Sequence, residues 1–411
     1  MIYETIKSCR LCGNAEQLSE HLDLGFQPLS GTFPLPGEEV ICGPLRLLIC
    51  QDCGLVQLGE NYDPELLYGE NYGYRSGLNP AMVKHLDDVA RHCERVASLR
   101  PGDVVLDIGS NDGTLLGRYQ VEGLARIGID PTSGKFAEFY NENIVRIETF
   151  FNSESINHID WLAPKQARVV TSIACFYDLQ KPLEFAFDVR DVLAEDGIWV
   201  SEQAYFPNVL AAHAYDGICH EHLEYYRLAD FAFICRMAGL QILDVQFNDV
   251  NGGSFMVTMC RDGAPYVGNP GNVEAALAAE SAMSSTFQIA ELREFLPRHR
   301  DQIRHVLTRL ANDGVAAYGY GASTKGNVLL NYCGITPELL PLILDVNPDK
   351  FGRVTPGSGI PIVDEAAAID HTNHLFVLIW AFGPQIIRKQ LPFLERGGKL
   401  IFPLPELDIV G

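Results

Sequence analysis

The chain has 411 residues, of which 47% are hydrophobic and 20% are charged, and its formal net charge at pH 7 is -22. This length exceeds the about 100–200 residues of one ordinary domain, so two or three domains with substantial cores are expected. The negative charge argues against a nucleic-acid partner, since such proteins need a basic face. The sequence shows no long uncharged apolar run and no export signal in MIYETIKSCRLCG, so we expect no membrane partner, a cytoplasmic location and reduced thiols.

Residues 1–75 are predicted to form a small zinc-binding module. They contain two CxxC pairs, CRLCG and CQDCG, each followed directly by glycine. Two such pairs can bring four thiolates to one tetrahedral zinc, and four cysteine ligands leave no open position for catalysis. Redox-active or merely buried cysteine pairs are the alternative, which a reducing compartment disfavours. The predicted ligands of this structural zinc are Cys9, Cys12, Cys50 and Cys53.

Residues 76–265 are predicted to form a doubly wound α/β domain that binds S-adenosylmethionine. The segment VVLDIGSNDGTLL reads as a strand, a glycine turn and a helix, and the next strand ends at an aspartate about 20 residues further on. Acidic side chains around the turn disfavour a pyrophosphate and favour a cofactor with ammonium and sulfonium charges. Gln203, at the end of a later strand, lies where ligands of open sheets bind. The predicted cofactor-binding residues are Asp107, Gly109, Asn111, Asp112, Gly113, Asp130 and Gln203.

Residues 266–411 are predicted to contain a helical linker and a second, Rossmann-like domain. The strand, turn and helix pattern returns in VAAYGYGASTKGNVLL, and Asp345 ends the following strand. The glycines of this turn allow close backbone approach, while hydroxyls and a lysine at a helix N-terminus suit a phosphate. A purely structural turn is the alternative. The predicted substrate-binding residues here are Gly321, Ser323, Lys325, Asn327 and Asp345.

The segment CHEHLEYY (219–226) has the densest cluster of ionisable side chains. Its histidines stand at i and i+2 rather than at the i and i+4 spacing of a zincin helix, so acid/base chemistry is favoured over metal binding. A second candidate cluster is LYGENYGYRSG, where Tyr68, Tyr72 and Tyr74 offer phenols to a developing oxyanion. Ordinary aromatic packing is the alternative for these tyrosines.

In their order along the chain, these segments resemble the sugar C-methyltransferases of deoxysugar and antibiotic biosynthesis, which act on nucleotide-linked 4-ketohexoses. The resemblance covers the CxxC pairs, YGYRSG, LDIGSNDGTLL, HEHLEYY, GYGASTKGN and LDVNPDK. It implies a nucleotide-sugar substrate of the dTDP type, held with the help of the C-terminal domain, and methylated at C3, with C5 as the alternative.

By the same resemblance, His222 would remove the proton next to the ketone, Glu221 would support it, and Tyr74 would lie near the sugar together with Tyr72. Some members have a tyrosine where this chain has Cys219, which leaves open the group that stabilises the enolate. Two other hypotheses remain at this stage: an NAD-dependent sugar-nucleotide oxidoreductase or epimerase, and a non-catalytic scaffold that binds zinc and a nucleotide. The sequence does not indicate an oligomeric state.

Overall fold

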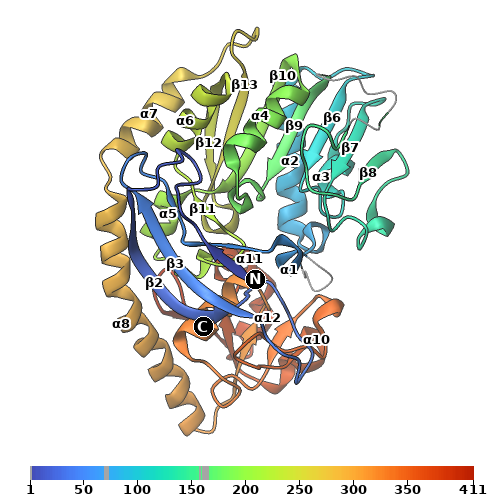
Figure 1. The fold of residues 1–411 in the computed structure, drawn as a ribbon. Helices are drawn as coiled ribbons and strands as arrows, with labels where there is room; N and C mark the ends of the chain where they lie inside the picture. The colour runs from blue at the N-terminus through green and yellow to red at the C-terminus, as the bar shows by residue number, and fades with distance from the viewer. Residues whose placement is uncertain (1, 69–73, 157–158, 160–165) are drawn as a thin grey trace.

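The computed structural model describes residues 2–68, 74–156, 159 and 166–411. Figure 1 shows a sheet-and-helix unit built from the middle of the chain, a second such unit built from the C-terminal residues, and N-terminal strands beside the long helix α8. The helices are α1 (Pro64–Leu67), α2 (Pro80–Ala97), α3 (Thr114–Arg118), α4 (Pro182–Val192), α5 (Phe206–Ala211), α6 (Leu228–Ala238), α7 (Pro270–Ser281), α8 (Ser285–Asn312), α9 (Thr324–Cys333), α10 (Glu365–Ala368), α11 (Gly383–Lys389) and α12 (Leu391–Glu395).

The central unit contains a seven-stranded sheet in the order β12-β13-β10-β9-β6-β7-β8. Its strands are β6 (Val104–Ile108), β7 (Ala125–Ile129), β8 (Ile144–Ile147), β9 (Ala167–Ile173), β10 (Leu193–Ala204), β12 (Leu240–Asn248) and β13 (Ser254–Arg261). The pairs from β8 through to β10 are parallel, and β13 pairs antiparallel with both β10 and β12. The chain leaves β6 toward β7 on one side and returns to β9 on the other, which creates a switch point beside β6.

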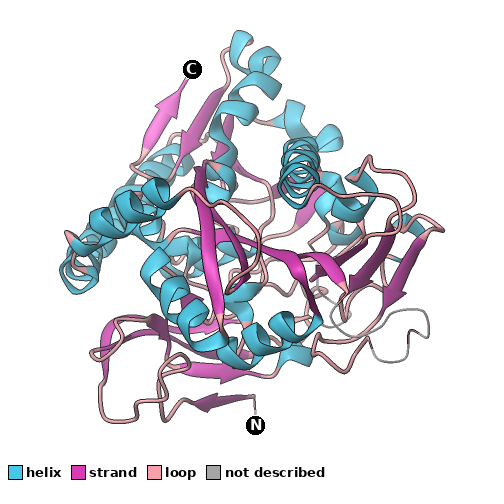
Figure 2. Cartoon of the chain, turned by 90° about the horizontal axis from the view of Figure 1, so that it is seen from above, coloured by secondary structure: helices cyan, strands magenta, loops and turns pink. Residues whose placement is uncertain are grey.

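Side chains of the central strands alternate between two hydrophobic cores. On β6, Leu106 packs with α4 and α6, whereas Val105 packs with α2 and α3 on the other face. Because both faces are covered, the strands are buried and apolar, as a doubly wound sheet requires. The view from above shows these helices on either side of the strands (Figure 2).

The C-terminal unit has a six-stranded sheet in the order β16-β15-β14-β17-β18-β19. Its strands are β14 (Ala317–Tyr320), β15 (Ile343–Asp345), β16 (Ile362–Asp364), β17 (His374–Val377), β18 (Lys399–Phe402) and β19 (Asp408–Val410). Numbered within the unit, this is the Rossmann order 3-2-1-4-5-6, with only the last strand antiparallel.

The N-terminal residues form a four-stranded antiparallel sheet in the order β11-β4-β3-β2, and β1 pairs with β5 beside it. The strands are β1 (Tyr3–Thr5), β2 (Leu18–Pro28), β3 (Cys42–Cys50), β4 (Val56–Leu58), β5 (Glu60–Tyr62) and β11 (Glu224–Tyr225). The edge strand β11 comes from the CHEHLEYY segment, more than 160 positions along the chain from β4. The N-terminal sheet is therefore completed by the segment that carries the candidate base.

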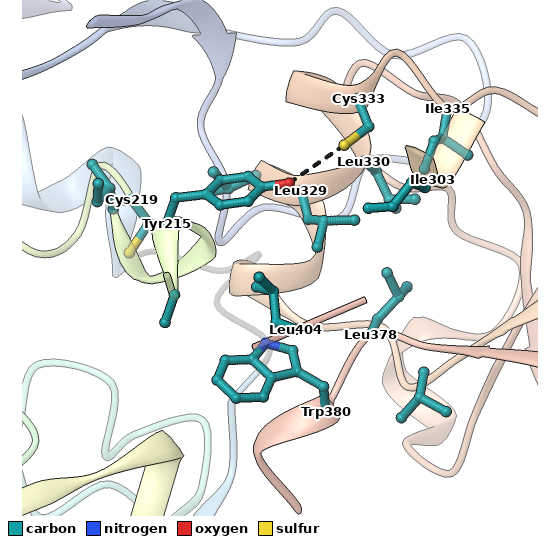
Figure 3. Packing of buried hydrophobic residues seen from close by; sticks show 14 of the residues in the cluster. Tyr215, Cys219, Ile303, Leu329, Leu330, Cys333, Ile335, Leu378, Trp380 and Leu404 are labelled. Carbon is teal, nitrogen blue, oxygen red and sulfur yellow. Dashed lines mark hydrogen bonds between the residues drawn. The ribbon is translucent and has the colours of Figure 1, made fainter. Parts of the chain in front are cut away.

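The segment around η4 (Tyr215–Gly217) connects the central and C-terminal units through a shared apolar core. Figure 3 shows the Tyr215 hydroxyl pointing at the Cys333 thiol of α9, 3.4 Å away. The indole of Trp380 donates a 2.6 Å hydrogen bond to the neighbouring Asp216 carboxylate. These buried contacts hold the two units against each other around the segment that leads into CHEHLEYY.

The predicted fold class, two doubly wound Rossmann-like units with a small N-terminal module, is confirmed. Among the described helices, none combines the length and the apolar character that a bilayer crossing requires.

Glu280 at the end of α7 generates a prediction about stability. Its buried carboxylate accepts from the first amides of α6, Leu228 N at 2.6 Å and Ala229 N at 2.9 Å, and from the Tyr205 hydroxyl at 2.9 Å. Glu280→Ala leaves these donors without a partner, so we expect the free energy of unfolding to fall by about 2–3 kcal/mol. Urea unfolding measures this value. Glu274→Ala, at an exposed position of the same helix, is the matched control; an equal loss in both variants would contradict the explanation.

Candidate functional site

The first glycine turn connects β6 to α3 at the switch point of the central sheet. Gly109 has φ +71°, and a Cβ placed on it would lie 3.0 Å from the Cys175 Cβ at the end of the neighbouring strand β9. A glycine is therefore needed on both conformational and steric grounds. Gly113, also with positive φ, precedes the first residue of α3. Because these two positions carry no side chains, a ligand can approach the backbone of the turn at the sheet edge where ligands of such folds bind.

The acidic side chains of this turn are engaged by neighbouring groups. Asp107 is buried and accepts from the Thr171 hydroxyl at 2.6 Å, and burial raises its pKa to about 7. Asp112 accepts from Gly77 N at 2.9 Å and from the Thr114 hydroxyl at 2.6 Å, and the Arg75 guanidinium lies 3.6 Å away. Asp107 therefore braces β6 against β9, while Asp112 holds the segment that precedes α2.

Asn111 also contacts that segment. Its side-chain oxygen accepts from Ser76 N at 2.9 Å, and its amide nitrogen donates to the Tyr74 carbonyl at 3.2 Å. The main chain of Tyr74 is thereby held against the glycine turn, and the residue is 45% exposed. Tyr72 lies outside the described residues.

Asp130 and Gln203 stand at the carboxyl ends of β7 and β10. Asp130 accepts from Asn111 N at 2.9 Å and from Thr132 N at 2.6 Å, and a carboxylate with about four lone-pair sites keeps capacity for a ligand hydroxyl. Gln203 is 2% exposed, and its amide nitrogen has no hydrogen-bond partner among the described residues. This buried donor lies at the sheet edge where ligands of open α/β folds bind.

The four cysteines of the two CxxC pairs come together in the N-terminal module. All four Sγ atoms lie within 4.8 Å of one another, and the Cys9–Cys53 and Cys12–Cys50 pairs are each 3.6 Å apart. A tetrahedron with 2.3 Å zinc–sulfur bonds has edges of about 3.8 Å, so the cluster fits zinc closely. The contact between the two sulfurs lowers the pKa of Cys9 to about 5 and raises the pKa of Cys53, as expected for thiols that share a proton.

A pocket lies between the central and C-terminal units and contains His222 and Lys325. Its lining comes from η3 (Phe176–Asp178), the end of β10, the segment 206–225, η5 (Val250–Gly252) and α9. The lining residues are Tyr177, Ala204, Phe206, Val209, Ala214, Gly217, His222, Glu224, Tyr225, Asn251, Gly252 and Lys325. The pocket thus brings together chemistry from both glycine-turn units.

His222 is oriented by a main-chain carbonyl. Its Nδ1 lies 3.0 Å from the Gly217 oxygen, which can only accept, so Nδ1 carries the proton and Nε2 presents a lone pair. The Tyr177 ring packs on the imidazole with centroids 4.1 Å apart. Burial, and secondarily the Lys325 charge, lower the pKa of His222 to about 3. The imidazole is therefore neutral at neutral pH, with Nε2 unprotonated, and it is a weak base in this setting.

The neighbours of His222 in the sequence have other partners. Glu221 accepts from the Ser30 hydroxyl at 3.0 Å, and burial raises its pKa. A Cβ on Gly31 would lie 2.1 Å from the second Glu221 oxygen, so glycine is required there. His220 is fully buried against Tyr62, with ring centroids 4.9 Å apart, and Cys219 is fully buried in the shared core.

The second glycine turn is braced from within the C-terminal unit. Asp345 accepts from Ala322 N at 2.7 Å, Gly321 has φ +83°, and the Ser323 hydroxyl caps α9 by accepting from Gly326 N at 3.0 Å. Asn327 donates to the Ser30 carbonyl at 2.8 Å, which ties α9 to the N-terminal module. Lys325 extends to the central unit instead, where it donates to the Asn251 carbonyl at 3.0 Å.

Several pocket residues were not singled out from the sequence. Tyr177 follows β9, and the expectation that ligands bind beyond strand ends was the only signal for it. Glu224 and Tyr225 belong to the CHEHLEYY segment, but their roles depend on β11 joining the N-terminal sheet. Asn251 had no signal, because it contributes a backbone carbonyl.

Three family models match the chain in succession. Residues 9–68 match a model described as "Putative zinc binding domain", residues 82–245 a methyltransferase domain, and residues 249–405 a C-methyltransferase C-terminal domain.

Among solved structures, the chain is similar to the 1,6-didemethyltoxoflavin-N1-methyltransferase of Burkholderia thailandensis with S-adenosylhomocysteine bound, at 12% identity and a TM-score of 0.34 over 45% of this chain and 80% of that one. It is similar to the plantazolicin methyltransferase BpumL with S-adenosylhomocysteine at 13% identity and a TM-score of 0.34, over 43% and 82% of the two chains.

A curated relative covers the whole chain. The C-methyltransferase NovU of Streptomyces niveus is 30% identical over 420 aligned positions, which span 100% of this chain and 98% of NovU. Together with the three domain matches in order, this full-length similarity shows that the chain belongs to the C-methyltransferase family.

Proposed function

We propose that this protein transfers a methyl group from S-adenosylmethionine to the carbon next to the ketone of a nucleotide-linked 4-ketohexose. The observation that carries the proposal is that His222 and Lys325 line the same small pocket, while the Gly217 carbonyl engages Nδ1 of His222 and leaves Nε2 as the nitrogen without a proton. A ketone makes its neighbouring C–H acidic enough for a histidine base when the enolate oxygen is stabilised. The dTDP nucleotide and methylation at C3 follow from the family resemblance of the motifs. Family membership disfavours the oxidoreductase and scaffold alternatives.

The domain division proposed from the sequence assigns one task to each part. Residues 1–75 hold zinc, residues 76–265 bind the methyl donor, and residues 266–411 help to hold the nucleotide sugar. S-adenosylmethionine supplies an electrophilic methyl group on a sulfonium centre. The residues proposed to hold it are Asp107, Gly109, Asn111, Asp112, Gly113, Asp130 and Gln203. The close approach at Gly109 and the place of the buried Gln203 at the end of β10 support this assignment.

His222 acts in this mechanism as the base that takes the sugar proton on Nε2. The Gly217 carbonyl keeps the proton of Nδ1 in place and stabilises the imidazolium that forms. Glu221 supports the segment through Ser30, since its hydrogen bond goes there. The electron pair of the broken C–H bond passes to the enolate, whose carbon is then the nucleophile.

Three tyrosines are proposed to serve the acceptor. Tyr225 is a pocket residue whose buried hydroxyl lies near the Cys219 main chain and has no side-chain partner in the described part of the chain. Burial raises the pKa of Tyr225 well above its usual value, so the phenol stays protonated and can donate to the enolate oxygen. Tyr74, an exposed residue against the glycine turn, lies near the sugar, and Tyr72 is kept as a proposed substrate residue.

The anionic part of the substrate is proposed to meet the C-terminal unit. Lys325 provides a cation at the pocket, and the turn residues Gly321 and Ser323 border the same helix N-terminus. Asn327 keeps one unpartnered oxygen among the described residues, and Asp345 holds the turn. Cys9, Cys12, Cys50 and Cys53 are proposed to bind one structural zinc, whose role is to stabilise the N-terminal module.

The base assignment is tested with His222→Gln. We expect kcat to fall by about 10²–10⁴-fold, because the general base is lost, while the Kd for S-adenosylmethionine stays within about twofold. The assay uses dTDP-4-keto sugars in deuterated water, with NMR and mass analysis locating the methyl group and any exchanged proton. His371→Gln, at an exposed position of the C-terminal unit, is the control. Methylation on oxygen or nitrogen with no exchange at any sugar carbon would exclude the enolate route.

The donor site is tested with Asp130→Asn. The amide keeps an acceptor for Asn111 N but removes the negative charge, so we expect the Kd for S-adenosylmethionine to rise about tenfold. Isothermal titration calorimetry measures it. Asp345→Asn changes the aspartate that ends the corresponding strand of the second unit and is expected to leave this Kd within about twofold. Equal weakening in both variants would remove Asp130 from the donor site.

The lowered pKa of His222 predicts the pH dependence. A base whose pKa lies near 3 stays unprotonated between pH 8 and pH 6. Protonation of His222 should therefore cause no fall in kcat/KM for the acceptor over this range. A histidine with an ordinary pKa of about 6.5 would lose about three quarters of its base form at pH 6. Initial rates at saturating S-adenosylmethionine measure the profile. An acid limb centred near pH 6.5 would show that the free enzyme holds His222 in a more solvated setting.

A further inference from the structure

Arg10 lies between the two cysteines of the first CxxC pair, yet its side chain points away from the cluster into the protein. The guanidinium side chain is only 2% exposed. It donates to the Leu58 carbonyl at 2.7 Å, the Glu60 carbonyl at 2.8 Å and the Asn61 side chain at 2.7 Å. Its backbone amide donates to Gln57, whose own amide donates to the Cys9 sulfur at 3.2 Å. One residue thus connects the cysteine cluster to both β4 and β5.

The same guanidinium reaches the segment that carries the candidate base. It lies 3.4 Å from the Leu223 carbonyl and 3.6 Å from the Glu224 carboxylate, and these two residues directly follow His222. Glu224 is a pocket residue whose side chain is fully buried, and neither of its oxygens has a hydrogen-bond partner among the described residues. Burial raises the pKa of Glu224 well above its usual value, and the nearby Arg10 guanidinium acts in the opposite direction.

The peptide at Leu223 that Arg10 contacts is also bonded to Tyr177, the pocket residue whose ring packs on His222. Leu223 N donates to the Tyr177 carbonyl at 2.8 Å, and Leu58 N donates to the Leu223 carbonyl at 2.8 Å. The main chain at Leu223 is thus held from both sides, by the N-terminal sheet with Arg10 and by η3 with Tyr177. A change at Arg10 reaches His222 and Tyr177 together through this one peptide.

We propose that Arg10 is a positioning residue that couples the four-cysteine cluster to the pocket by holding Leu223 and Glu224 directly after His222. The zinc module then organises the acceptor pocket in addition to stabilising its own strands. This inference uses the proposed function only in taking the pocket as the place where the acceptor binds.

The experiment is hydrogen–deuterium exchange of the full chain, followed on peptides spanning 219–226, with Arg10→Met. We expect the 219–226 amides to exchange at least tenfold faster, while the donor turn at 104–116 keeps its exchange rate. Arg46→Met is the matched control, because Arg46 lies in the same N-terminal sheet and pairs with the fully buried Glu60. This control also removes an arginine that pairs with a buried glutamate, and the hydrogen bonds of the Arg46 side chain among the described residues go to Glu60 and Glu20 rather than to Leu223. Arg10→Lys, which keeps the charge but loses the planar fork, covers the case in which Arg10→Met fails to fold.

A second arm uses the metal itself. The zinc content of the chain is measured before and after chelation, and the same peptides are followed in the metal-depleted protein. Faster exchange at 219–226 together with 9–12 and 50–58 supports the coupling. If residues 9–12 and 50–58 exchange faster after metal removal but residues 219–226 do not, the proposed coupling is overturned. It is also overturned if Arg46→Met accelerates exchange at 219–226 as much as Arg10→Met does. The exchange readout needs no substrate, so its failure is distinguishable from absence of methyl transfer.

In active enzyme, the same variant separates positioning from general destabilisation. Arg10→Met is expected to lower kcat about tenfold or more, with the KM for S-adenosylmethionine within about twofold, whereas Arg46→Met changes neither. An unchanged kcat in Arg10→Met would overturn the positioning role.

Discussion

The antiparallel pairing of β11 with β4 is the contact on which the rest of the candidate site depends. It places residues 224–225, from the middle of the chain, on the edge of a sheet built from the N-terminus. His222 stands two residues before this strand, so its position is set by a sheet that does not belong to its own domain. Backbone ladder bonds are directional and nearly obligatory for buried segments, which makes this a rigid constraint.

One consequence is that the three parts of the chain share cores. The shared core around Tyr215 contains residues of β2, β3 and β4, of the segment 206–225 and of the C-terminal sheet. A second core joins Cys9 and Cys50 to the strands of the central sheet. Each part is therefore stabilised by the others, and the pocket lies where they meet.

Sequence patterns predicted the parts of this structure that depend on local order. A strand, a glycine turn, a helix and a strand-end aspartate occur within about 30 residues, so both Rossmann-like units could be found from spacing. The CxxC pairs were equally local, and their four sulfurs do meet. The strand β11 is two residues long and pairs across more than 160 positions, so no periodicity could indicate it. For the same reason, no sequence pattern could indicate that Arg10 lies beside Glu224 or that Asn327 bonds to the Ser30 carbonyl, since each pair is far apart in the chain.

The electrostatics of the pocket link binding of the acceptor to the strength of the base. In the free protein, burial and the Lys325 charge both disfavour the imidazolium form of His222. An anionic substrate that pairs with Lys325 removes one of these two penalties, and its own negative charge favours protonation nearby. The pKa of His222 then rises toward the range in which a histidine is an effective base. In the proposed function, Lys325 thus supplies a local cation for an anionic acceptor in a protein whose net charge is -22, and pairing with that acceptor removes the smaller of the two penalties on the imidazolium.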